Sequence, residues 1–206
     1  MKKAPVITFA VACVALCVHL LPGLGTELEM SRSGLREGEI WRLLTGHLTH
    51  FTTEHLKWDL VVFGALGSLV ELRNRRHFLS ILAGSAVAIS LAVIWFQPQF
   101  TTYRGLSGVD CALYGYIAMD ILILSLLERR RGPALVAGAA CVFLVAKVVF
   151  EMVTGRAFFV DSAASFTPVP LAHLVGACVG AGRALLSGRS LAGRSKLRFS
   201  KSVVQA

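Results

Sequence analysis

The sequence predicts an all-α, polytopic membrane protein with a six-transmembrane-helix bundle, and three observations predict that fold class. The chain has 206 residues, of which 55% are hydrophobic and only 16% are charged, and its mean hydropathy is +0.66. The apolar residues occur in long blocks, each near the ~20 residues that a helix needs to cross the hydrocarbon core. The basic residues form short clusters between these blocks and at the end of the chain, a pattern typical of membrane topology.

Six apolar blocks are predicted to be membrane spans. The first follows Lys2 and Lys3 and has some features of a signal peptide, but its length and the absence of a small-x-small cleavage site favour a retained helix. The six predicted spans are residues 4–21, 55–72, 78–96, 107–127, 133–153 and 168–186. We therefore expect one membrane domain over residues 1–188, followed by a basic cytoplasmic tail over residues 189–206.

The segment between the first two predicted spans is too polar to cross a membrane. It nevertheless contains apolar side chains, among them Ile40, Trp41 and Phe51, that suit a membrane surface. We expect residues 24–54 to form an outer loop that is partly embedded in the membrane.

The distribution of basic residues predicts the orientation of the chain. Six spans place both termini on one side, and that side carries 14 Lys and Arg residues against 6 on the other. Because basic residues concentrate on the cytoplasmic side, both termini are expected there, in a multi-pass protein of the cell (inner) membrane. The net charge of +9 is explained by this topology, so the lipid bilayer is the expected partner and nucleic acid is not.

Polar residues suited to catalysis gather at the outer ends of three predicted spans. His55 and Asp59 begin the second span, Ser107 begins the fourth, and His173 lies about one and a half turns into the sixth. With a helical rise of ~1.5 Å per residue, all four fall in one shallow layer beneath the outer surface. Within Gly105-Leu106-Ser107-Gly108, the glycines permit a turn that presents a hydroxyl together with backbone N–H groups, as a nucleophile beside an oxyanion site requires.

Small residues predict close packing between the fourth and sixth spans. Gly108 and Gly115 lie on one face of the fourth span, and Gly176 and Gly180 lie on one face of the sixth. Small residues let membrane helices approach closely. Such an approach would bring Ser107 within hydrogen-bonding distance of His173, whose neutral imidazole could accept the serine proton.

The remaining polar residues within the spans have less specific interpretations. Lys147 and Glu151 are one turn apart and are expected to pair with each other, although their depth also makes Lys147 the favoured partner of Asp110. Asp120 has no evident partner. The five cysteines lie inside apolar blocks without a Cys-x-x-Cys pair, so neither a disulfide framework nor a metal site is expected. No cofactor is predicted.

Several motifs together resemble the rhomboid intramembrane serine proteases. They are Trp41-Arg42, His50-Phe51, His55-x-x-x-Asp59, Gly105-Leu106-Ser107-Gly108 and Ala172-His173-x-x-Gly176-x-x-x-Gly180. The Tyr-Arg-Gly-Leu-Ser-Gly form and the compact length are most similar to the rhombosortase branch. The resemblance implies a serine endopeptidase with Ser107 as nucleophile and His173 as general base, and with an oxyanion hole that includes His55 and the Ser107 N–H. It also implies that Glu71 is a structural acid.

The resemblance further implies the kind of substrate. Rhomboid proteases cut transmembrane or juxtamembrane segments of membrane-anchored proteins, and rhombosortase substrates carry a C-terminal Gly-Gly motif, an apolar helix and a basic tail. Transpeptidation is a second reaction that an acyl-enzyme would permit. The substrate itself is not identified by the sequence.

The residue Asp59 departs from the family pattern, in which Asn is common. An ionised carboxylate cannot donate a hydrogen bond to an oxyanion, as an amide can. Either Asp59 is neutral and donates its proton, which is the preferred alternative because a buried carboxylic acid can act in that way, or it is ionised and orients His55 by pointing at His55 or Lys57.

Two other functional classes are compatible with parts of the sequence. A non-catalytic rhomboid-like protein that binds membrane helices would usually lack the serine or the histidine, and this chain has both. A transporter or haem-binding membrane protein would place facing ligands within the membrane core, whereas the histidines here gather near one surface. His47 and His50 are expected to serve the structure of the outer loop, and His19 and His77 to lie near span ends.

Overall fold

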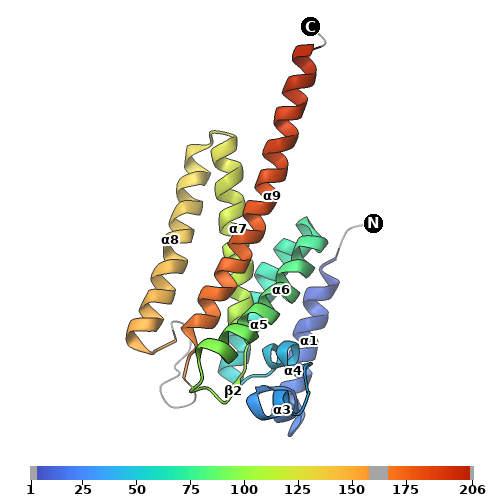
Figure 1. Cartoon of the computed structure of the whole chain (residues 1–206), viewed down its shortest axis with the longest axis vertical. Helices are drawn as coiled ribbons and strands as arrows, with labels where there is room; N and C mark the ends of the chain where they lie inside the picture. Colours follow the sequence, from blue (N-terminus) through green and yellow to red (C-terminus); the bar gives the residue numbers. More distant parts are fainter. Residues whose placement is uncertain (1–3, 158–166, 205–206) are drawn as a thin grey trace.

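The computed structural model describes residues 4–157 and 167–204, with side chains described as far as residue 188. The chain is mostly helical (Figure 1). Six long helices lie at the predicted blocks: α1 (Val6–Leu20), α5 (Thr53–Arg73), α6 (Arg75–Phe96), α7 (Ser107–Leu127), α8 (Arg131–Thr154) and α9 (Pro170–Val204). Between α1 and α5 lie the short elements α2 (Leu24–Leu28), β1 (Met30–Ser31), α3 (Arg32–Arg36), α4 (Arg42–Thr45) and the 3₁₀ turn η1 (Gly46–Leu48).

Among the described residues, four helices are long and apolar enough to cross a membrane, namely α6, α7, α8 and residues 170–188 of α9. These four helices make the chain a multi-pass membrane protein. The apolar helix α1 has only 15 residues, and α5 carries charged residues near both ends, including Asp59 and Glu71. The helix α9 continues to Val204, so most of the predicted tail is helical.

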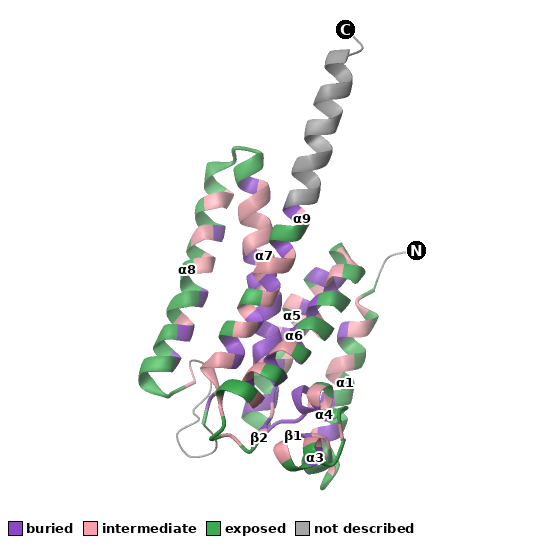
Figure 2. Cartoon of the chain, in the orientation of Figure 1, coloured by how far each residue is buried: buried purple, intermediate pink, exposed green. Residues whose placement is uncertain are grey.

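The helix α7 lies at the centre of the bundle. Buried residues follow it along much of its length, as the purple segments of Figure 2 show, whereas α8 is mostly exposed at the edge. An exposed apolar face is expected for a helix that borders lipid. The large buried side chains of the core come from neighbouring helices, with Phe63 on α5, Phe78 and Ile89 on α6, and Leu113 on α7.

The helices α7 and α9 pack against each other with almost no space between their backbones. A Cβ atom added at Gly176 would lie 1.9 Å from the carbonyl oxygen of Gly108, and one added at Gly180 would lie 1.8 Å from that of Ala112. A Cβ added at Gly115 would meet the Ala177 oxygen at 2.9 Å. Only glycine fits at Gly176 and Gly180, and this contact sets the position of α9 along α7.

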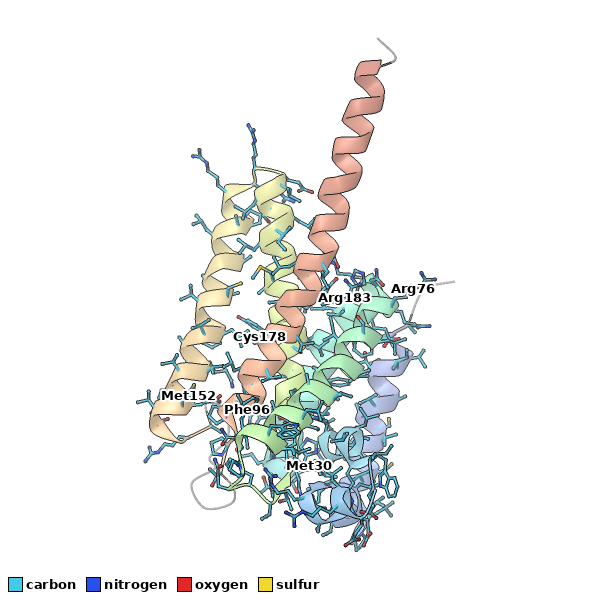
Figure 3. The ribbon with its side chains drawn as sticks, in the orientation of Figure 1. Met30, Arg76, Phe96, Met152, Cys178 and Arg183 are labelled. Atoms are coloured by element: carbon cyan, nitrogen blue, oxygen red, sulfur yellow. The ribbon has the colours of Figure 1, made fainter. Side chains whose placement is uncertain are left out.

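A two-residue antiparallel β pair joins the outer loop to the segment before α7. Met30 pairs with Tyr103 and Ser31 with Thr102, so β1 lies beside β2 (Thr102–Tyr103). The all-α prediction missed this pair because two residues give no periodic signal. Figure 3 places Met30 near one end of the bundle, whereas Arg76 and Arg183 lie toward the other side, at the level where α5 ends and α6 begins.

Two arginines, the buried Arg42 and the half-buried Arg32, hold the outer loop in place. Arg42 is paired with Glu39 and donates to the carbonyl oxygens of Thr26 and Glu29 at 3.1 and 2.9 Å. Arg32 donates to carbonyl oxygens near the C-terminus of α6, among them that of Ile94 at 2.8 Å. These donors satisfy carbonyl groups that a loop or a helix end leaves without partners.

Candidate active site

The segment before α7 is shaped to present Ser107 at the start of that helix. Gly105 has φ of +120°, a backbone conformation that favours glycine. A Cβ atom at this position would also lie 2.8 Å from the His55 ring. The next residue, Leu106, donates its N–H to Asp59 Oδ2 at 2.8 Å, and Ser107 is the first residue of α7.

The close packing of α7 and α9 brings two of the predicted site residues together. Ser107 Oγ lies 2.9 Å from His173 Nε2, within the distance at which a base can take the proton of a nucleophile. His173 comes from the first turn of α9 and is buried. The neighbouring residues Gly108 and Ala172 touch, since a Cβ atom at Gly108 would meet the Ala172 carbonyl oxygen at 3.1 Å.

The other nitrogen of the His173 ring faces a carboxylate that the sequence interpretation did not include in the site. Glu151 Oε2 lies 2.6 Å from His173 Nδ1, and Glu151 Oε1 lies 2.7 Å from Lys147 Nζ. The expected Lys147–Glu151 pair is therefore present, but it reaches His173 as well. A sequence signal existed: an ion pair inside an apolar helix, near the depth of His173, had to face the bundle interior.

Asp59 accepts hydrogen bonds around the nucleophile segment. Besides the Leu106 N–H, its Oδ2 atom lies 3.0 Å from His50 Nε2 and 3.4 Å from His55 Nε2. A backbone N–H can only donate, so Oδ2 acts there as an acceptor. This arrangement fits the orienting alternative better than the preferred proton-donating one, with His50 as a partner that the sequence did not indicate. Lys57 instead lies over the Trp58 ring at 5.2 Å.

His47 connects the outer loop to the nucleophile segment. Its Nε2 lies 2.9 Å from the Ala86 carbonyl oxygen on α6, and its Nδ1 lies 3.3 Å from the Gly105 carbonyl oxygen. Burial lowers the pKa of His47 from 6.5 to about 4, although both carbonyl contacts favour the charged form. The ring is therefore neutral at neutral pH, and it fixes the loop structure as expected.

Donors suited to an oxyanion lie next to Ser107. The first N–H groups of a helix have no acceptor within the helix, and the helix dipole adds positive potential there. In α7 these groups belong to Ser107, Gly108 and Val109. The His55 ring lies against Gly105 and stacks on the Phe51 ring, with centroids 6.4 Å apart.

A cavity of about 590 Å³ opens beside Ser107 and His173. Its walls include apolar side chains of α5, among them Val62 and Leu66, and of α8, among them Phe143. This volume is in the range of cavities that hold small ligands or a short peptide segment. The site therefore combines a polar floor with apolar walls contributed by two different helices.

The other polar residues within the spans do not take part in the contact between Ser107 and His173. Asp110 lines the cavity, and its Oδ1 has no hydrogen-bond partner among the described residues. Lys147 pairs instead with Glu151, at 2.7 Å. Asp120 lies 3.5 Å from Arg73. His77 Nδ1 lies 2.7 Å from the Tyr116 hydroxyl, near the opposite end of the bundle.

Glu71 and His19 also lie in structural contacts. Glu71 is buried on α5 and accepts from the Thr8 N–H at 2.8 Å and the Thr8 hydroxyl at 2.9 Å, so it ties α1 to α5. His19 Nε2 lies 3.1 Å from Thr53 Oγ1. Among the described residues, no group of three or more His, Cys, Asp or Glu side chains is arranged to hold a metal ion.

Known proteins with similar sequences cover most of this chain. A Rhomboid domain profile matches residues 37–190, a range that includes Ser107, Glu151 and His173. The chain is 29% identical over 123 residues to the rhomboid protease GlpG of Pectobacterium atrosepticum, covering 56% of this chain but only 44% of GlpG. It is 25% identical over 185 residues to the putative rhomboid protease YdcA of Bacillus subtilis, with 85% of each chain covered.

Proposed function

Because the chain belongs to the rhomboid family, we propose that it is an intramembrane serine endopeptidase whose catalytic dyad is Ser107 and His173. The observation that carries this proposal is the 2.9 Å contact between Ser107 Oγ and His173 Nε2 at the start of a central helix. The names of both relatives agree with protease activity. A non-catalytic helix-binding protein has no need of such a contact.

The mechanism follows from the positions of the two residues. His173 Nε2 accepts the Ser107 Oγ proton while Oγ attacks the scissile carbonyl carbon. The C–N bond then breaks, His173 passes the proton to the leaving amine, and an acyl-enzyme remains. Water, deprotonated by the same imidazole, hydrolyses the ester and restores the serine. A second amine in place of water would give transpeptidation.

Oxyanion stabilisation is assigned to groups around the start of α7. The N–H groups of Ser107 and Gly108 point away from the helix, where no intrahelical acceptor competes. His55 contributes a ring N–H from α5, and Gly105 lets that ring approach the segment because it has no side chain. Asp59 supports this arrangement by accepting from the Leu106 N–H and by contacting the imidazole of His50.

The cavity between α5 and α8 suggests how a substrate reaches Ser107. Its apolar walls suit the end of a transmembrane helix, and its floor carries the polar groups that hydrolysis requires. Membrane-anchored proteins are therefore the proposed substrates. The similarity of the Tyr-Arg-Gly-Leu-Ser-Gly segment to the rhombosortase branch makes C-terminal Gly-Gly sorting tails the proposed subclass.

The proposed topology has six spans in the cell membrane, with both termini cytoplasmic and the dyad near the outer face. The side of the bundle toward which Arg76 and Arg183 lie, away from Met30 (Figure 3), is then the cytoplasmic side, in accord with the positive-inside rule. The helices α1 and α5 supply the two spans that length and composition alone do not establish.

Labelling with a fluorophosphonate tests the dyad without a known substrate. Purified protein in liposomes is treated with the reagent, and the modified residue is located by mass spectrometry. We expect modification at Ser107 that disappears in Ser107→Ala and in His173→Ala. If Ser107→Ala is modified as fast as the wild type, the serine-protease proposal fails.

Substrate choice is tested with a single-pass reporter in the same liposomes. The reporter carries a Gly-Gly motif, an apolar helix and a basic tail, and its matched control carries two alanines in place of the glycines. Cleavage of the first and not of the second supports the sorting-tail subclass. Equal cleavage of both removes that subclass and leaves the protease proposal intact.

A further inference from the structure

The polar contacts at Ser107 continue past His173 into a third helix. Ser107 Oγ, on α7, lies 2.9 Å from His173 Nε2, on α9. His173 Nδ1 lies 2.6 Å from Glu151 Oε2, on α8. Lys147 Nζ, one turn before Glu151, lies 2.7 Å from its Oε1 and 3.3 Å from His173 Nδ1. Four side chains from three helices are thus joined in one chain of contacts.

We propose that Glu151 is the positioning residue of a Ser107–His173–Glu151 triad, and that Lys147 keeps its carboxylate ionised and in place. The inference rests on the proposed function and deepens it, because a dyad alone assigns no role to either residue of α8. Glu151 does not reach the substrate bond in this assignment. It acts through the imidazole.

The contact between Glu151 and His173 selects one form of the ring. A neutral imidazole carries a single proton, on either Nδ1 or Nε2. An ionised carboxylate only accepts, so the proton is drawn to Nδ1, and Nε2 then presents its lone pair to Ser107 Oγ. This is the form that a general base needs, and it is the role of the buried acid in Ser-His-Asp hydrolases.

The burial of Glu151 explains why Lys147 is present. Glu151 is only 1% exposed, and an ionised carboxylate removed from water is costly without an opposite charge. Lys147 supplies that charge from one helical turn away. An ammonium so close to His173 would by itself oppose formation of the imidazolium, and the carboxylate between them offsets this repulsion when His173 takes the serine proton.

Other charged or titratable groups lie near the imidazole. Asp110 on α7 and His55 and Asp59 on α5 line the same cavity as His173. None of these three has a hydrogen bond to His173 among the contacts of the described residues, whereas Glu151 approaches it at 2.6 Å. The geometry therefore gives the positioning role to Glu151.

The test separates the chemical step of fluorophosphonate labelling from binding of the reagent. In this reaction the Ser107 Oγ–P bond forms, the P–F bond breaks with loss of fluoride, and the Oγ proton passes to His173. The maximal rate, kinact, depends on the state of the imidazole, while the half-saturating concentration, KI, depends on the cavity. Both constants are measured on the full-length protein in liposomes.

Glu151→Gln is the decisive variant. Its amide can donate to Nδ1 and so stabilise the form of the ring with a proton on Nε2, which cannot accept from Ser107. We expect kinact to fall at least about a hundredfold, with KI changed by less than about threefold, since the equivalent Asp-to-Asn change in a serine protease costs about 10⁴. Glu151→Asp keeps a carboxylate and is expected to recover part of the lost kinact.

Glu71→Gln is the matched control. Glu71 is also a buried carboxylate that accepts several hydrogen bonds, but it lies near the C-terminal end of α5, far along that helix from His55 and Asp59. We expect this variant to lower thermal stability and to leave kinact at the wild-type value. Such a result separates the loss of a buried acid in general from the loss of the acid behind His173.

The outcomes distinguish this inference from the proposed function. Wild-type kinact in a folded Glu151→Gln overturns the triad even if Ser107→Ala abolishes labelling. If Glu151→Gln does not fold, Lys147→Met decides: a fall in kinact of about tenfold or more supports the four-residue chain, and an unchanged kinact overturns it. Persistent labelling of Ser107→Ala overturns the protease proposal instead.

Discussion

Replacement of Gly176 by alanine should inactivate the protein although this residue performs no chemistry. The new Cβ would lie 1.9 Å from the Gly108 carbonyl oxygen, while real Cβ atoms essentially never approach closer than 3.0 Å. The helix α9 must therefore retreat from α7 by at least about 1.1 Å, because the obstructing atom is backbone and cannot rotate away. Gly176 is less than one turn from His173, so the imidazole moves with it.

This displacement is large compared with the contact that it disturbs. A Ser107–His173 distance of 2.9 Å would become about 4 Å, beyond the ~3.2 Å limit for proton transfer along a hydrogen bond. Misplacement by about 1 Å costs about a hundredfold in rate, so we expect kinact of fluorophosphonate labelling to fall by about that factor. The same packing loss should lower the melting temperature.

Gly182→Ala is the control on the same helix. A Cβ at Gly182 meets nothing within 4 Å, and alanine is the better helix former by about 1 kcal/mol, so this variant should keep its activity and its stability. The reasoning would be refuted by a Gly176→Ala protein that folds with wild-type stability and labels at the wild-type rate. Gly180→Ala, whose Cβ would lie 1.8 Å from the Ala112 carbonyl oxygen, should behave like Gly176→Ala.

Three further predictions concern the site itself. The Ser107→Ala, His173→Ala double variant should be little less active than either single variant in reporter cleavage, since the two residues act as a unit; additive losses would contradict this. Asp59→Asn should be labelled at a rate within about tenfold of the wild type, because its amide oxygen still accepts from the Leu106 N–H, whereas Asp59→Leu leaves that N–H unsatisfied and should lower the free energy of unfolding by about 1–3 kcal/mol. Neither the wild type nor Asp59→Asn should lose labelling rate at high pH; a loss seen only in the wild type would restore the proton-donating alternative. The free energy of unfolding should fall by up to roughly 3 kcal/mol between pH 7 and pH 4, because the pKa of His47 is about 4 in the folded chain and the unfolded chain binds the proton first; His47→Asn should remove this part of the pH dependence in thermal unfolding.

The helices and the depth of the site residues were predictable because hydropathy and helical rise depend on the sequence alone. The predicted spans agree with the six long helices to within a few residues at most ends, although only four of these helices meet the criteria for a membrane span. A shared depth for Ser107 and His173 also follows from counting residues, and their 2.9 Å distance agrees with it. Their catalytic roles stay a prediction.

What the sequence could not supply was the rotation of each helix about its axis. The interpretation of Asp59 failed to include His50 because the two residues come from different elements, and nothing in their spacing requires the 3.0 Å contact. The β pair between Met30 and Tyr103 was missed because strands of two residues give no periodic signal. Contacts between elements depend on the whole packing arrangement, which a single sequence does not reveal by periodicity.

Glu151 shows where such an interpretation can be extended. A lysine and a glutamate one turn apart form a neutral pair on any helix, so their spacing alone explains their presence. In an apolar helix at the edge of a bundle, however, a neutral pair still costs more than two apolar residues would. A third partner offsets this cost, and the structure provides one in His173. The ring of His173 contacts Ser107 through Nε2, so its Nδ1 is available to Glu151.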